Sequence, residues 1–303
     1  MSRIDEALKR ASGDVRETTA AKEQYPGEST LTKYPSEGPA TATLEGDIHR
    51  EVVNRRASET RRFQFVRGLT QSGKPDRARL ESDAKLVSSK TDFVGLEQYR
   101  RLAAFLHDAQ LANGLRVVTI TSALPRDGKT LTTVNLALTL SESYSRRVLL
   151  IDADMRRPSV HSVLGVNNST GLNDVLRGET QELPLVVVSP TLSVLTSGGS
   201  QSTPLAGLAS NRMRMLLDDC ASRFDWVLLD VPPVGLLADA QILGHLTGAV
   251  ILVIRAGSTP HAVVERAIAQ IGRESIIGTV LNGVEEPSAF GRAYYRSYVD
   301  DER

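Results

Sequence analysis

The sequence lacks the features of a secreted, membrane-spanning or strongly charged protein. Its one cysteine, Cys220, cannot form a disulfide within the chain, which fits a reducing compartment. No apolar run reaches the about 18 residues that a transmembrane helix needs, and the first residues do not resemble a signal peptide. The 36 basic and 36 acidic residues cancel, so net charge gives no attraction to nucleic acid. These absences predict a cytoplasmic protein without a nucleic-acid partner.

Residues 1–90 also have few aromatic residues and are rich in Glu, Arg, Ser, Thr and Pro. Such a composition buries too little apolar surface to fold alone, so we expect a largely disordered, low-complexity N-terminal extension. Within it, the apolar spacing over residues 3–11 predicts a short amphipathic helix that needs a partner. A basic stretch from Arg55 to Arg67 includes Phe63 and Phe65. We interpret it as a solvated linker, with contact to anionic lipid or an acidic partner as the alternative.

Residues 91–285 alternate between strand-like and helix-like patterns. This alternation predicts an α/β fold with a doubly wound, mostly parallel sheet covered on both faces. We expect strands at 116–122, 147–152, 226–230, 248–254 and 276–282, short strands near 185 and 192, and helices at 92–114, 129–142, around 158–176, 204–222, 238–246 and 260–272. Residues 286–303 follow the last strand as a flexible tail.

A phosphate-binding loop is predicted between the first core strand and its helix. The loop ends in Gly128, Lys129 and Thr130, so free backbone N–H groups and a lysine would face an anion, and the threonine hydroxyl would ligate Mg²⁺. The motif usually begins with glycine, and an ordinary strand-to-helix turn is the alternative. The residues expected to bind the nucleotide are Ala123, Leu124, Pro125, Arg126, Asp127, Gly128, Lys129, Thr130 and Leu131.

Two further apolar strands end in aspartate. Asp152 and Asp154 follow the first of these strands, and Arg156 and Arg157 come next, able to offset their charge or contact phosphate. Asp230 ends the second strand, before two prolines that stop it. Since ligands bind at the carboxyl edge of open parallel sheets, these carboxylates are candidates for holding Mg²⁺ or accepting a proton. The alternative for each is a solvated turn.

These three motifs together resemble the bacterial tyrosine kinases of capsular and exopolysaccharide biosynthesis. The segments 123–130, 151–158 and 228–233 are similar to their Walker A, A′ and B motifs, and the resemblance extends from Phe93 to the C-terminus. It implies a P-loop NTPase fold of the MinD/ParA-like superfamily. It also implies an ATP-dependent protein-tyrosine kinase that phosphorylates itself and regulates polysaccharide polymerisation and export.

The resemblance assigns roles to individual residues. Lys129 would hold the phosphates, and Thr130, Asp152 and Asp230 would bind Mg²⁺ or its water. Asp154 would support the metal site or the transferred group, and either Asp152 or Asp154 would take the acceptor's proton. Asn282, at the end of the last strand, would touch the adenine.

Three tyrosines near the C-terminus are the expected phosphate acceptors. Tyr294, Tyr295 and Tyr298 are three of the chain's seven tyrosines, and their surroundings are polar. A tail that is not tied down can reach the active site of another molecule. The alternative is a terminal apolar strand that packs on the sheet.

The resemblance also implies partners. These are a separate transmembrane chain-length regulator that activates the kinase and recruits it to the membrane, a second copy of the chain, and a counteracting tyrosine phosphatase. Many family members assemble through Glu-x-x-Arg-x-x-Arg; this chain keeps Glu97 and Arg100 but has Ala103 at the last position. Ring assembly is therefore less secure than nucleotide binding.

Two other functions stay open from the sequence. A partition or division-site ATPase of the same superfamily would use water as the phosphate acceptor. Those proteins typically have a second lysine early in the loop, where this chain has Leu124. A non-enzymatic switch that binds nucleotide and changes partners is the other alternative.

Overall fold

The computed structural model describes residues 63–65, 86–87, 93–180, 182–199, 205–235 and 238–284. The predicted helix at 3–11 and the tyrosine tail at 286–303 lie outside the described residues. Among the helices within those ranges, none is long and apolar enough to cross a membrane.

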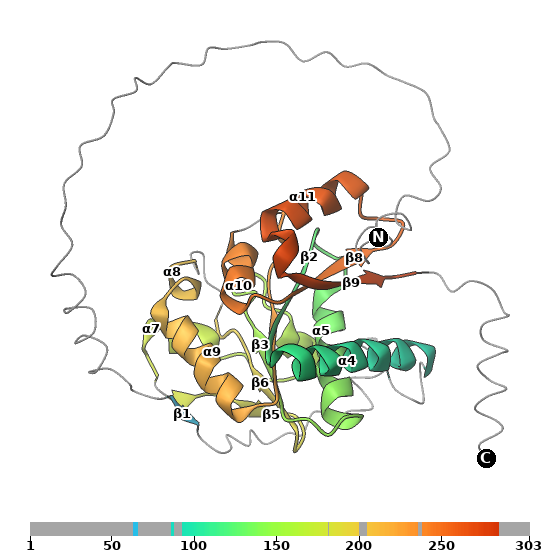
Figure 1. Ribbon diagram of the computed structural model, residues 1–303. Coiled ribbons are helices and arrows are strands. Elements are labelled where there is room, and N and C mark those ends of the chain that lie inside the picture. Colours follow the sequence, from blue (N-terminus) through green and yellow to red (C-terminus); the bar gives the residue numbers. More distant parts are fainter. Residues whose placement is uncertain are drawn as a thin grey trace, which may run out of the picture. The chain divides into compact units, whose positions relative to one another are not determined.

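A seven-stranded sheet forms the centre of the described fold (Figure 1). Its strand order is β5-β6-β3-β7-β2-β8-β9, and every neighbouring pair is parallel except β5 with β6. The strands are β2 (Val117–Ser122), β3 (Val148–Asp152), β5 (Val186–Val187), β6 (Leu192–Leu195), β7 (Trp226–Asp230), β8 (Val250–Arg255) and β9 (Ile276–Asn282). The predicted mostly parallel α/β sheet is confirmed.

Helices connect the strands and cover both faces of the sheet (Figure 1). They are α4 (Phe93–Asn113), α5 (Lys129–Glu142), α6 (Val160–Leu164), α7 (Leu172–Arg177), α8 (Leu205–Leu208), α9 (Asn211–Arg223), α10 (Asp239–Thr247) and α11 (His261–Ile271), with a 3₁₀ turn at Arg273–Ser275. The single helix predicted at 204–222 is wrong. The helical conformation is interrupted between α8 and α9. Ser210 lies in this interruption, and its Oγ accepts a hydrogen bond from the Met213 N–H (3.2 Å) and so caps α9.

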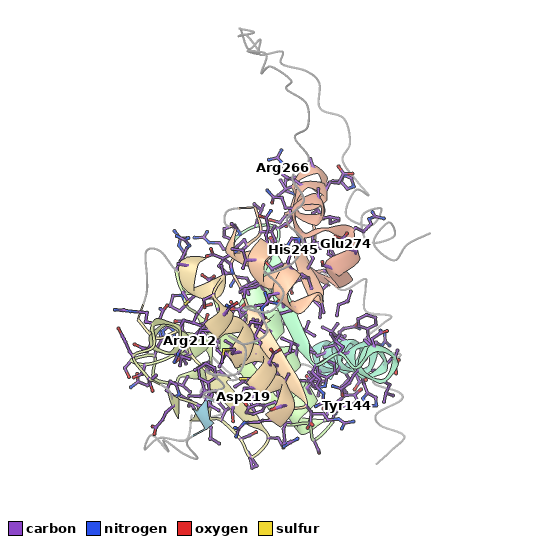
Figure 2. All side chains as sticks on the ribbon, turned by 60° about the vertical axis from the view of Figure 1, so that its left-hand side comes forward. Tyr144, Arg212, Asp219, His245, Arg266 and Glu274 are labelled. Atoms are coloured by element: carbon purple, nitrogen blue, oxygen red, sulfur yellow. The ribbon has the colours of Figure 1, made fainter. Side chains whose placement is uncertain are left out.

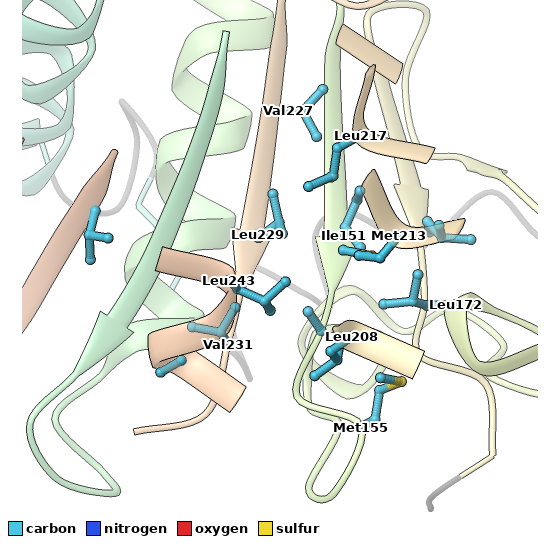
Figure 3. Packing of buried hydrophobic residues seen from close by; sticks show 14 of the residues in the cluster. Ile151, Met155, Leu172, Leu208, Met213, Leu217, Val227, Leu229, Val231 and Leu243 are labelled. Atoms are coloured by element: carbon cyan, nitrogen blue, oxygen red, sulfur yellow. The ribbon is translucent and has the colours of Figure 1, made fainter. Parts of the chain in front are cut away.

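Alternate residues of each central strand enter opposite cores because strand side chains point to the two faces in turn. In β3, Leu149 and Ile151 pack toward α7–α11, while Val148 and Leu150 pack toward α4, α5 and α6. Figure 3 shows the first of these cores. Burial on both faces explains why the central strands are runs of branched apolar residues. The free thiol Cys220 is buried in the same core as Ile151, where it packs as a small apolar side chain.

Packing begins earlier in the chain than the predicted boundary at residue 91. Phe63 is 4% exposed in the α7–α11 core, and the Arg212 guanidinium (labelled in Figure 2) lies 5.1 Å from the centre of its ring. The next residues form β1 (Gln64–Phe65), which pairs in parallel with β4 (Glu182–Leu183). Leu86 is buried in the opposite core. Part of the predicted extension therefore belongs to the fold.

The departure at Ala103 has a packing reason. Ala103 is fully buried in the core between α4 and the sheet, where an arginine side chain has no room. Glu97 and Arg100, by contrast, form a partly exposed ion pair on α4. The assembly motif of the family is therefore incomplete on this surface.

Candidate active site

The three predicted motifs meet at the carboxyl edge of the sheet. Strands β3, β7 and β2 are consecutive neighbours, and Asp152 pairs in register with Asp230. The loop between β2 and α5 begins on the same edge, directly after Ser122. Residues separated by about a hundred positions in the sequence are thus side by side because parallel strands end together.

The loop turns through two left-handed residues before α5 starts. Arg126 has φ 71° and Gly128 has φ 98°. A Cβ on Gly128 would lie 2.0 Å from Nδ2 of Asn282, so glycine is needed both for its φ and for this close approach. The amide of Asn282 donates to the carbonyl of Asp127 (2.8 Å). Asn282 therefore supports the loop, and its contact with adenine stays a prediction.

Asp127 fixes the shape of the loop from within. One carboxylate oxygen accepts from the Leu124 N–H (2.8 Å), and the other accepts from the Thr259 hydroxyl (2.8 Å). Burial raises the pKa of Asp127, although these hydrogen bonds oppose the shift. Thr259 was not predicted as a site residue, because its segment carries no motif. Only the fold brings it to the loop.

Lys129 points into a group of carboxylates. Its Nζ lies 3.0 Å from Asp154 Oδ2 and 3.3 Å from Asp230 Oδ1, and only 9% of the residue is exposed. Burial alone would lower the pKa of Lys129, but the charges of Asp230 and Asp154 raise it above its ordinary value. The side chain is therefore a fully charged cation at the point where a phosphate would arrive.

The Thr130 hydroxyl connects this group to the segment after β3. It donates to Asp230 Oδ2 (2.7 Å) and lies 2.9 Å from the Ser159 Oγ. Asp152 Oδ2 accepts from the N–H groups of Ser159 and Val160, both at 3.0 Å. Ser159 is a second residue that the sequence analysis missed; a serine just before a short helix gave no signal of its own.

Burial opposes the ionisation of two of these carboxylates, and Lys129 supplies one positive charge beside three aspartates. Burial and the neighbouring charge of Asp230 raise the pKa of Asp152 to about 8, and burial also raises the pKa of Asp230. Such a pair fits a hard divalent ion, since hydroxyl and carboxylate oxygens are the ligands that Mg²⁺ takes. In the described ranges no set of three or more His, Cys, Asp or Glu forms a metal cage. Phosphate oxygens and water would complete the coordination around Thr130, Asp152 and Asp230.

A cavity of about 470 Å³ opens beside the loop. Asp154 lines it, whereas Asp152 is fully buried and does not line it. Arg156 also lines the cavity, and its Nε lies 3.1 Å from Asp239 Oδ2 at the start of α10. Asp239 is a third residue that the sequence analysis did not identify, because it lies outside the three motifs. The full lining comprises Pro125, Arg126, Gly128, Lys129, Thr130, Leu131, Asp154, Arg156, Arg157, Ser159, Pro232 and Pro233.

A buried lysine that begins a helix and faces acidic strand ends is the arrangement of P-loop nucleotide-binding domains, and this chain folds as one. The AAA-domain family model matches residues 116–263. The tyrosine-protein kinase YwqD of Bacillus subtilis is 34% identical over 203 residues, an alignment that covers 66% of this chain and 85% of that protein. The chain therefore belongs to the bacterial tyrosine-protein kinase family, as the motifs predicted.

Other relatives agree over the same region. The tyrosine-protein kinase wzc of Salmonella typhimurium is 32% identical over 226 residues, which cover 73% of this chain but 31% of that longer protein. The kinase domain of the Escherichia coli tyrosine kinase ETK has a TM-score of 0.60 and 32% identity, covering 64% of this chain and 77% of that domain. The relatives favour a protein-tyrosine kinase over the partition-type ATPase.

Proposed function

We propose that this kinase binds Mg·ATP at the 123–131 loop and transfers the γ-phosphate to its own C-terminal tyrosines, Tyr294, Tyr295 and Tyr298. The observation that carries the proposal is that the carboxylates of Asp154 and Asp230 both lie within 3.3 Å of the Lys129 ammonium group. When phosphate arrives, Lys129 exchanges these carboxylates for phosphate oxygens. Catalysis of this kind rests on positioning and charge neutralisation around the transferred group.

The carboxylates divide into two roles in this proposal. Asp152 and Asp230, with the Thr130 hydroxyl, hold Mg²⁺, which neutralises charge on the phosphates when bound. Asp154 accepts the proton of the acceptor tyrosine, because it lines the cavity and Asp152 does not. The N–H of Arg157 donates to Asp154 Oδ1 (3.0 Å) and fixes the orientation of that carboxylate.

The biological role that we propose is control of exopolysaccharide polymerisation and export from the cytoplasmic side of the membrane. A separate transmembrane chain-length regulator would recruit and activate the kinase, two copies of the chain would phosphorylate each other, and a tyrosine phosphatase would reverse the reaction. Each phosphate adds roughly −1.5 to −2 charges, which would repel a tail from an acidic site. Family membership supports this role.

The test is to incubate the purified chain with Mg·ATP and map phosphotyrosine by mass spectrometry. It is run with and without the cytoplasmic segment of the regulator. We expect phosphate on Tyr294, Tyr295 or Tyr298 and none in Lys129→Met. Replacing the three tyrosines by Phe should remove most of the signal while ATP still binds.

Three results would contradict the proposal. Phosphate that stays mainly on Tyr25 or Tyr34 would exclude the tail as the acceptor. ADP formation without phosphotyrosine, even with the regulator segment, would favour the partition-type ATPase. Unchanged phosphorylation in Lys129→Met would refute the assignment of the site.

A further inference from the structure

Two arginines at the mouth of the cavity form no ion pair with the buried carboxylates of the site. Arg126 and Arg157 both line the cavity and are exposed. Within the described residues neither side chain forms an ion pair, whereas Arg156 between them is paired with Asp239. We call Arg126 and Arg157 the rim arginines.

The interior has the opposite charge. Lys129 is matched by three buried carboxylates, so the floor of the site is acidic until a divalent ion and a nucleotide arrive. The rim arginines form no ion pair with these carboxylates. Arg126 also holds a left-handed φ of 71°, a conformation that costs an arginine about 1 kcal/mol or more and that tends to persist where function requires it.

The chain contains a segment of matching charge. Asp300, Asp301 and Glu302 follow Tyr298 within four residues. A tyrosine whose hydroxyl meets Asp154 brings the next few residues over the mouth of the cavity, since each extended residue spans about 3.3 Å. Arginines are suited to carboxylates because their guanidinium groups bind them in a fixed, bidentate geometry.

We infer that the rim arginines, Arg157 above all, recognise the acidic residues 300–302 and so select Tyr298 as an acceptor. This inference rests on the proposed function, because it names what guides the tail to that site. It assigns Arg157 a substrate-specificity role.

The test measures binding rather than catalysis. The host is the full chain carrying Asp300→Asn, Asp301→Asn and Glu302→Gln, so that its own tail competes weakly. Two fluorescent peptides of residues 292–303, with each tyrosine replaced by Phe, are titrated in the presence of Mg·ADP. One keeps the acidic residues and the other carries the same three neutral substitutions.

We expect the acidic peptide to bind about five- to tenfold more tightly, with a preference that shrinks as salt is added. Arg157→Gln should reduce the preference to less than twofold. In Arg157→Glu, a peptide with Asp300→Lys and Asp301→Lys should bind more tightly than the acidic one. Arg214→Gln, an exposed arginine on α9, is the matched control and should keep the preference.

Equal binding of the two peptides, or no binding of either, would overturn the inference. So would a preference that survives Arg157→Gln while the affinity for a non-hydrolysable ATP analogue falls, because Arg157 would then serve the nucleotide. The phosphotyrosine map of the wild-type chain is measured separately. The map shows whether the kinase phosphorylates its tail, and the peptide titration shows separately whether the rim arginines prefer the acidic residues.

Discussion

Asp152 is held in a position that favours its neutral form. Its carboxylate is fully buried, pairs in register with Asp230, and has a pKa of about 8. A carboxylic acid in an unfolded chain ionises near pH 3.8. Between these two values the folded, metal-free chain holds a proton that the unfolded chain has released. Folding is therefore opposed increasingly as the pH rises.

The stability of the metal-free chain should therefore depend on pH through Asp152. In EDTA, the free energy of unfolding should fall from pH 5 to pH 8, by at most about 1.4 kcal/mol per pH unit for one proton. Asp152→Asn should flatten this slope, and urea titrations at four pH values would measure it. Asp225→Asn is the control: the backbone N–H and side chain of Arg147 outweigh burial and lower the pKa of Asp225, so its titration falls below this window. An unchanged slope in Asp152→Asn would exclude Asp152 as its source.

At the scale of the element, the nucleotide loop depends on a strand far along the chain. The last residue of β9, Asn282, donates to the Asp127 carbonyl and lies against Gly128. Thr259, in the connection after β8, holds the other side of the loop through the Asp127 carboxylate. The loop is thus shaped by residues at the ends of two neighbouring strands, β8 and β9, as well as by its own sequence.

Gly128→Ala should weaken nucleotide binding, because the new methyl group would meet Asn282 Nδ2 at 2.0 Å and displace the amide that holds the loop. We expect at least a tenfold loss of affinity for a fluorescent ADP, measured by titration. Gly178→Ala is the matched control, since Gly178 also has a left-handed φ (80°) but nothing within 4 Å of the added carbon. It should cost about 1 kcal/mol of stability and leave ADP binding intact. Equal effects would show that φ alone, and not the contact, matters.

The sequence predicts helices and strands better than it predicts helix caps and contacts between residues far apart in the chain. Helix α5 and strands β7 and β9 lie at their predicted bounds, because periodicity and the flanking motifs are local signals. The break at Ser210 was missed because a serine inside an apolar pattern does not distinguish a cap from an exposed helix position. Asp127 was predicted, but its bond to Thr259 was not. That contact joins residues 132 positions apart and leaves no trace in either segment.

At the scale of the whole molecule, residues before the kinase domain take part in its core. Phe63 fills a site in the α7–α11 core beneath Arg212, and Leu86 fills a site in the opposite core. The low-complexity composition of residues 1–90 hides both of them, because isolated apolar residues form no periodic pattern. A chain that begins at residue 91 would leave both sites open.

Phe63→Ala should therefore destabilise the chain by about 3 kcal/mol, the cost of removing a buried aromatic ring and leaving a cavity. Urea denaturation followed by tryptophan fluorescence would measure it, since the chain's one tryptophan, Trp226, is buried in β7. Leu111→Ala is the control: Leu111 is 74% exposed on α4, and its loss should change stability by less than about 0.5 kcal/mol. Equal stability of the two variants would mean that Phe63 contributes nothing to the fold.

The bond between Asn282 and the Asp127 carbonyl also sets when the enzyme becomes competent during its synthesis. The two residues are 155 positions apart, and β9 is the last strand of the sheet in chain order. A growing polypeptide on the ribosome carries the phosphate loop early, yet lacks the amide that holds that loop until β9 has been made. Translation thus completes the loop only after Asn282, shortly before it adds Tyr294, Tyr295 and Tyr298, the acceptors that we propose.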